Sequence, residues 1–221
     1  MSTNVNTQVH SFTLFFDGAS VLEDVQFDAL HEEGCDDALF GARDGVQYGA
    51  FDREAGSFSE ALASAIHDVT AAVPGLRVIR IEPDELVTMA AIAERGGISR
   101  EYVRLLSNTE RGPGGFPAPV ARVDKKTRLW YWPDVAHWLI EHRKSKVAVD
   151  AHAADLVAAM NAAYELREHA THLDSPSDLL LVAQALGDGP LRKRLAMRLL
   201  TGEGIDADAL AEVRRDGWTR A

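Results

Sequence analysis

Four polar side chains at helical spacing, all of types that contact DNA, lie between residues 99 and 110. They are Arg100, Arg104, Ser107 and Asn108. Residues three and four apart share one face of a helix. Arginine can donate two hydrogen bonds to guanine and asparagine can pair with adenine, while serine suits bases or phosphates. The pattern therefore predicts a helix that reads the major groove, with Arg100 and Arg104 deepest; the alternative is a solvated surface helix.

A second group of donors follows on a short hairpin. The runs 120–123 and 128–132 are rich in β-forming residues and flank a turn at residues 124–127 that carries two lysines. Such a basic tip suits contact with the DNA backbone or the minor groove. The complete set of candidate DNA-binding residues is Ser99, Arg100, Arg104, Ser107, Asn108, Arg111, Arg122, Lys125, Lys126 and Arg128.

The elements that must position these donors are two short helices and a tight turn. Thr88 can cap a first helix that ends near Arg95, and Gly97 can adopt the positive φ that the turn needs. Ser99 can cap the second helix, expected to run to about Glu110. The residues expected to pack the two helices together are Ile92, Ala93, Gly97, Ile98, Val103 and Leu106. This is the spacing of a helix-turn-helix.

A proline-rich loop and a third helix complete this region. Residues 111–119 contain too many prolines and glycines for a helix or a central strand. Pro133 then begins a helix whose inward side chains are Val135, Trp138 and Leu139. Trp130 and Trp132 are expected in the core with Trp138 rather than as platforms for bases, because a domain of this size needs large apolar side chains.

The order of these features resembles the winged helix-turn-helix of the MerR superfamily, and most closely its excisionase and AlpA-like regulators. The resemblance covers residues 86–142 and includes the phrases GlyGlyPheProAlaPro and TrpTyrTrp followed by AspValAlaHisTrpLeu. It implies DNA binding with the second helix in the major groove and the wing on the backbone. The chain departs from that family by carrying a large segment before the DNA-binding region, so no effector chemistry is carried over.

The charge distribution agrees with one DNA-binding face. The chain has a formal net charge of −11, yet residues 88–146 contain eleven Lys and Arg against six Asp and Glu. A basic region in an acidic chain is the expected electrostatic pattern of a single DNA-binding surface. No apolar run is long enough to span a membrane, the N-terminus lacks the shape of a signal peptide, and Cys35 is the sole cysteine. We therefore expect a cytoplasmic protein without disulfides.

Residues 10–83 predict a separate α/β domain. Strands are expected at 10–16, 37–41, 46–51 and 76–81. Ser20 is expected to cap a helix over 20–33 with Leu22, Val25 and Leu30 inward, and Ser57 to cap a second helix that ends at Pro74. The Asp44–Gly45 pair is a strong hairpin signal. The order βαββαβ fits a ferredoxin-like fold. Its open sheet face could dimerise, bind a ligand or bind a protein partner, and we favour a protein.

The remaining chain, residues 147–216, predicts a helical region. An alanine-rich helix at 147–172 carries an apolar stripe at coiled-coil spacing, composed of Val149, Ala153, Leu156, Met160 and Ala163. The stripe could dimerise the protein or pack on other helices of the chain. Further helices are expected from Ser175, at 191–200 and at 206–215. The fold class is thus α+β, with a ferredoxin-like domain at 10–83, a winged helix-turn-helix at 86–143 and this helical region.

No catalytic or metal-binding pattern rises above chance. His169, His172 and Asp174 suggest a solvated helix end, and the acidic residues near positions 17 and 32–37 suggest surface loops. We expect no enzyme activity and no cofactor. The leading interpretation is a sequence-specific regulator that binds double-stranded DNA as a homodimer. The alternative is an antitoxin-like or phage-related adaptor, or an excisionase-like architectural factor, in which partner binding dominates.

Overall fold

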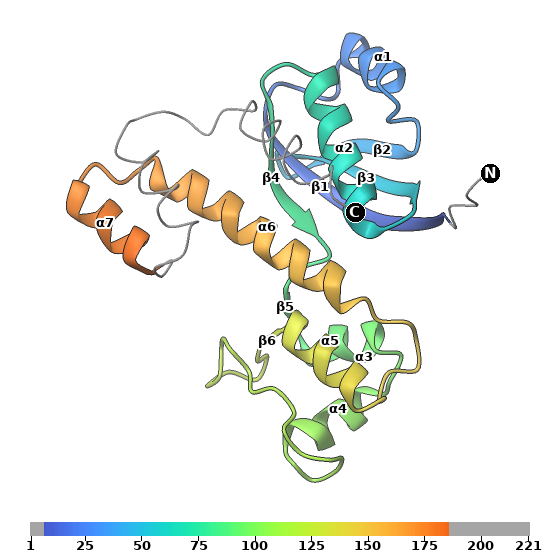
Figure 1. Cartoon of the computed structure of the whole chain (residues 1–221), viewed down its shortest axis with the longest axis vertical. Coiled ribbons are helices and arrows are strands. Elements are labelled where there is room, and N and C mark those ends of the chain that lie inside the picture. Colours follow the sequence, from blue (N-terminus) through green and yellow to red (C-terminus); the bar gives the residue numbers. More distant parts are fainter. Residues whose placement is uncertain (1–6, 186–221) are drawn as a thin grey trace, which may run out of the picture. The chain divides into compact units, whose positions relative to one another are not determined.

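The structure is a computed structural model and describes residues 7–185. The chain is α+β, with a four-stranded antiparallel sheet and helices first and a mostly helical part after it (Figure 1). By backbone contacts it divides into two compact units, residues 1–165 and 166–221. The elements are β1 (Gln8–Gly18), α1 (Asp24–Glu32), β2 (Ala38–Arg43), β3 (Val46–Ala55), α2 (Phe58–Ala72), β4 (Leu76–Glu82), β5 (Leu86–Val87), α3 (Met89–Arg95), α4 (Arg100–Ser107), β6 (Trp130–Tyr131), α5 (Trp132–Glu141), α6 (Ala151–Ala170) and α7 (Pro176–Ala185).

The sheet has the strand order β2-β3-β1-β4, and every neighbouring pair is antiparallel. The predicted hairpin between β2 and β3 is confirmed, because Asp44 and Gly45 both have positive φ, 52° and 84°. Two successive left-handed residues make the turn whose twist matches that of the strands. All four predicted strands of this domain are present, and β1 and β3 extend beyond their predicted ends.

One face of this sheet packs against α1 and α2 (Figure 1). The core combines alternate residues of the strands, such as Phe12, Leu14 and Phe51, with Leu62 and Val69 of α2. The prediction that Ser57 caps α2 is confirmed, since its Oγ accepts a hydrogen bond from the backbone N–H of Glu60. Burial of these large apolar side chains is the main contribution to the stability of the domain.

The prediction for α1 was wrong in its start and in its inward face. The helix begins at Asp24 rather than at Ser20, and Val25, expected inside, is 75% exposed. The physical reason is that Val21, just before the helix, is fully buried and occupies the core position. Within the nine-residue helix, Leu30 is then the buried apolar side chain.

A second core lies beneath α3, α4 and α5. Ile92 of α3, Val103 and Leu106 of α4 and Leu139 of α5 are all almost completely buried, and so is Trp130. The two-residue strands β5 and β6 pair beside it, Leu86 opposite Tyr131 and Val87 opposite Trp130. This pairing was not predicted.

The apolar stripe of α6 packs within the chain. Of the predicted stripe, Ala153, Leu156 and Met160 pack against the core of the sheet domain, and Val149 packs against the core beneath α3, α4 and α5. Ala163, expected in the stripe, is exposed. The buried Asn161 bonds both backbone groups of Ile81 in β4, with its Oδ1 2.8 Å from the nitrogen and its Nδ2 2.9 Å from the oxygen. The stripe is therefore engaged with this chain's own cores rather than free for a coiled coil.

The predicted helix from Ser175 is present as α7. The helices expected at 191–200 and 206–215 lie outside the described residues. Over residues 7–185, no helix combines the length and the apolar character needed to cross a membrane.

Candidate nucleic-acid interface

Two capped helices and a left-handed glycine build the framework of the candidate interface. Thr88 Oγ1 accepts a hydrogen bond from the N–H of Ala91 at 3.2 Å, and α3 begins there. Gly97 has a φ of 60°, which reverses the chain before Ser99. Ser99 Oγ accepts from the N–H of Tyr102 at 3.1 Å, and α4 begins there. Each local prediction for this turn is confirmed, although α4 ends at Ser107 rather than near Glu110.

The hairpin after α4 is shorter than predicted. Its two sides meet in a single bridge between Ala121 and Leu129, where the N–H of Leu129 donates to the oxygen of Ala121 at 3.0 Å. The expectation of strands over 120–123 and 128–132 was wrong for two reasons. Arg122 has a φ of 51°, which turns the chain directly after Ala121. Trp130 and Tyr131 pair with β5 instead, and Trp132 already belongs to α5.

Tryptophan N–H groups shape the proline-rich loop that joins α4 to this hairpin. The indole Nε1 of Trp138 donates to the oxygen of Gly114, and that of Trp130 donates to the oxygen of Pro117, both at 3.1 Å. Phe116 meets the Trp138 ring edge-on at 5.0 Å between centroids. The three tryptophans are thus core residues, as predicted, and two of them also fix the loop. A buried indole N–H needs a partner, which is the sequence signal that could have predicted these contacts.

Arg104, the central candidate on α4, lies between two carboxylates. Its Nε and Nη2 contact Glu101 at 2.9–3.1 Å, and its Nη1 contacts Glu110 at 3.2 Å. Asn108 donates from Nδ2 to the same Glu110 at 2.8 Å. We call the four residues Glu101, Arg104, Asn108 and Glu110 the clamp. The side chain of Arg104 is nevertheless 41% exposed, so solvent or a ligand can reach it.

The clamp also shifts the ionisation of its carboxyl groups. The hydrogen bond from Arg104 lowers the pKa of Glu101, and the bonds from Asn108 and then Arg104 lower the pKa of Glu110. Both residues are therefore charged at neutral pH and oppose the approach of phosphate. The sequence interpretation missed this role, although the i, i+3 spacing of Glu101 and Arg104 was available as a signal.

The other candidates on and beside α4 are exposed or half-buried. Ser107 donates from Oγ to the backbone oxygen of Arg104 at 3.0 Å, so its hydroxyl is already bonded. Arg100 is exposed at the first position of the helix. Arg111 lies over the ring of Tyr102, with its guanidinium carbon 5.8 Å from the ring centroid.

The hairpin candidates lie apart from the clamp. Arg122, Lys125 and Lys126 are exposed at the tip, where Lys125 pairs with Asp124 at 2.9 Å. Arg128 stacks over Trp130 at 5.5 Å. Among residues 7–185, no hydrogen bond or ion pair joins the tip to the α4 donors. The ten predicted residues thus form two exposed groups, one on α4 and one on the hairpin.

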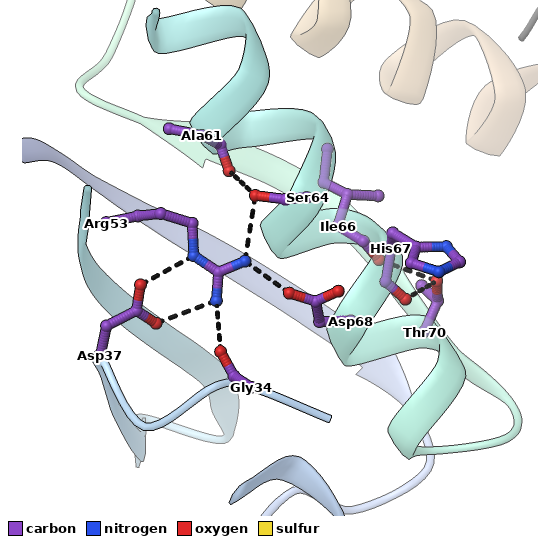
Figure 2. Close-up of polar contacts among 9 residues, drawn as sticks. All are labelled: Gly34, Asp37, Arg53, Ala61, Ser64, Ile66, His67, Asp68 and Thr70. Carbon is purple, nitrogen blue, oxygen red and sulfur yellow. Dashed lines mark hydrogen bonds and ion pairs between the residues drawn. The ribbon is translucent and has the colours of Figure 1, made fainter. Parts of the chain in front are cut away.

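The densest polar cluster of the sheet domain is structural. Arg53 is 6% exposed, and its five N–H groups have five acceptors: both oxygens of Asp37, Asp68 at 2.5 Å, Ser64 Oγ and the oxygen of Gly34 (Figure 2). This network ties the loop before β2 to β3 and α2. Because Arg53 has no donor left for a ligand, it offers no binding site.

Nucleophilic or metal chemistry finds no support in the described part of the chain. Cys35 is buried, and burial raises the pKa of its thiol to about 11, which keeps it protonated at neutral pH. Among residues 7–185, no cluster of three His, Cys, Asp or Glu side chains could hold a metal ion. Asp17, one of the acidic residues noted in the sequence, pairs with Arg77 across the sheet.

Comparison with protein-family models, with curated proteins and with solved structures found no match for this chain.

Proposed function

We propose that residues 86–142 form a winged helix-turn-helix and that the protein is a sequence-specific regulator that binds double-stranded DNA in the bacterial cytoplasm. In this proposal α4 enters the major groove, and residues 124–127 contact the backbone or the minor groove. The sheet domain belongs to the ferredoxin-like class and receives a partner or signal.

The observation that carries the proposal is the turn between α3 and α4. Gly97 in the left-handed region and Ser99 as a cap join two short helices through a tight turn, and Ile92, Val103 and Leu106 are buried in their shared core. These features support a helix-turn-helix. The second helix then presents Arg100 and Arg104 on its exposed side. An exposed pair of arginines on such a helix is the usual reader of guanine.

Charge supports the same proposal. Residues 88–146 carry eleven basic against six acidic residues, whereas residues 7–87 carry four basic against sixteen acidic. Attraction to phosphate is therefore confined to the proposed DNA-binding region, and the acidic remainder lowers non-specific affinity.

Selection of bound duplexes from a random pool tests this function directly. We expect one enriched motif, and we expect Arg104→Ala and Lys126→Ala to weaken binding of that motif with a smaller salt dependence. Arg143→Ala, an exposed arginine outside both the candidate set and the sheet domain, is the matched control. Parent-like binding by both test variants would reject the mechanism.

A second candidate function follows from the clamp. Glu101 and Glu110 already satisfy Arg104, which favours an adaptor or antitoxin-like role in which DNA contact is secondary. Co-purification of a stoichiometric protein, with no duplex shift at moderate salt, would support this alternative. Bending of the bound duplex would instead support an excisionase-like architectural role.

A further inference from the structure

The sheet domain has a second face, turned away from α1 and α2. The register pairs Phe15 with Tyr48 and Thr13 with Ala50, and paired residues of antiparallel strands point to the same side. None of these four residues belongs to the core, whereas their neighbours Leu14 and Phe51 do. We call the side that carries Phe15 and Tyr48 the open face.

The centre of the open face carries aromatic and aliphatic side chains. The rings of Phe15 and Tyr48 lie 6.4 Å apart between centroids. The side chain of Tyr48 also covers Gly41 on the neighbouring strand β2. A Cβ added at Gly41 would lie only 2.7 Å from the hydroxyl oxygen of Tyr48. Leu39, opposite Ala50 in the register, is 70% exposed. An exposed apolar centre of this kind is suited to packing against another protein surface.

Charges of opposite sign lie at the two ends of the open face. The register puts Arg43 beside Val46 at one end, and Arg77 of β4 lies at that end too, where β1 finishes. Asp52 and Glu54 lie toward the other end, beside the start of β1. Arg77 and Arg80 are held by carboxylates of the same chain, Asp17 for Arg77 and Asp84, Glu85 and Glu165 for Arg80. Among residues 7–185, Arg43 is the basic side chain of this end that has no ion pair.

We propose that the open face binds the open face of a second copy of this chain. A two-fold axis that lies across the strands, between the Phe15–Tyr48 row and the Thr13–Ala50 row, stacks the apolar centres. The same rotation sets Arg43 of each copy against Asp52 of its partner. The face is thus complementary to itself, as an isologous interface requires. Nucleic acid is disfavoured as the occupant, because Asp52, Glu54 and Glu82 would repel phosphate.

The open face is a better candidate for dimerisation than the apolar stripe of α6, because the stripe packs within its own chain. The stripe residues Ala153, Leu156 and Met160 already pack against the core of the sheet domain, and Val149 packs against the second core of the same chain, so a coiled coil through α6 would require opening both cores. The proposal depends on the sheet alone and goes beyond the DNA-binding function, so each can fail without the other.

Sedimentation equilibrium of the full chain tests the proposal without DNA. We expect a dimer for the parent and a monomer for Leu39→Asp. Because Leu39 is exposed, the variant should keep the fold of the parent, which circular dichroism can check. Val25→Asp, an equally exposed apolar residue on α1, should remain dimeric. A monomeric parent would overturn the proposal and leave the face to a different partner protein, and a dimer that survives Leu39→Asp would also overturn it.

Charge reversal distinguishes the proposed axis from other arrangements. Arg43→Glu and Asp52→Arg should each weaken self-association about tenfold or more, because each homodimer then holds two repulsive pairs. An equimolar mixture should restore association as a heterodimer with both pairs attractive. Failure of the mixture to associate more tightly than either variant alone would reject this arrangement.

Discussion

In the proposed DNA complex, the carboxylates of the clamp and the DNA compete for the guanidinium group of Arg104. Exposed ion pairs are weak because water screens them, and both carboxylate partners of Arg104 are about half exposed or more. A bidentate contact with guanine discriminates by about 1–3 kcal/mol. A correct base can therefore displace Glu110, while an unspecific backbone contact gains much less. In the proposed complex, the clamp would therefore favour specific over non-specific DNA sites.

Glu110→Gln should accordingly raise the affinity for duplexes in general and reduce the discrimination between them. Removal of one negative charge and of one Arg104 partner should tighten non-specific binding about fivefold. Fluorescence anisotropy with matched and scrambled duplexes measures both effects. Glu141→Gln, with the same change of charge at an exposed position on α5, should have the smaller effect; an equal effect would mean that net charge alone is responsible.

Arg53 is the residue whose loss should most damage the sheet domain. Arg53→Met removes five hydrogen bonds and leaves Asp37 and Asp68 without their partner at 26% and 20% side-chain exposure. Breaking a buried charge network of this kind costs about 3 kcal/mol or more. Urea unfolding followed by circular dichroism should show the loss. Arg100→Met, at an exposed helix position, should change the free energy of unfolding by less than about 0.5 kcal/mol.

At the scale of elements, the turn between α3 and α4 depends on Gly97. An alanine there must adopt a φ of 60°, and its Cβ would be 2.8 Å from Cγ1 of Val147. The left-handed conformation alone costs about 1–2 kcal/mol. Gly97→Ala should therefore destabilise the region that contains α3, α4 and α5. Tryptophan fluorescence during urea unfolding measures this loss, because the core of the region contains tryptophans. Gly114→Ala is the matched control, since its φ is 86° but nothing lies within 4 Å of the added Cβ. A loss no larger than the control's would mean that Val147 moves aside freely.

Elements with strong local signals were predictable, and elements made by distant pairing were not. Thr88, Ser99 and Ser57 cap helices through bonds that span three residues, so the sequence alone indicated them. The Asp44–Gly45 turn is equally local. The pairing of β5 with β6 joins segments more than forty residues apart through two residues each, and no local pattern marks it.

The candidate site was predictable in its residue types but not in its contacts. The exposure of Arg100 and Lys126 follows from helix and hairpin periodicity. The engagement of Asn108 and Arg104 by Glu110 depends on how the chain leaves α4, where Thr109 has a φ of 59°. A left-handed threonine is uncommon, so sequence rules would not have placed Glu110 against the helix end.

At the scale of the whole molecule, the dimer and the DNA-binding region lead to one joint prediction. Two copies that associate through the sheet carry two copies of α4, so the selected duplex should contain two half-sites related by two-fold symmetry, a whole number of helical turns apart. Linking two recognition units raises the affinity for such a duplex about 10²-fold or more over a single half-site.

Leu39→Asp should remove this gain and leave each recognition unit intact. Its affinity for a duplex with one half-site should equal that of the parent, because α4 and the hairpin are unchanged. Its affinity for the two-half-site duplex should fall about 10²-fold. Titration of both duplexes by anisotropy at one salt concentration separates the affinity of a single recognition unit from the gain due to dimerisation. If Leu39→Asp binds the full site as tightly as the parent, cooperation between half-sites does not come from the sheet. If the selected motif has no symmetry, the protein reads DNA as one unit, and the open face serves association alone.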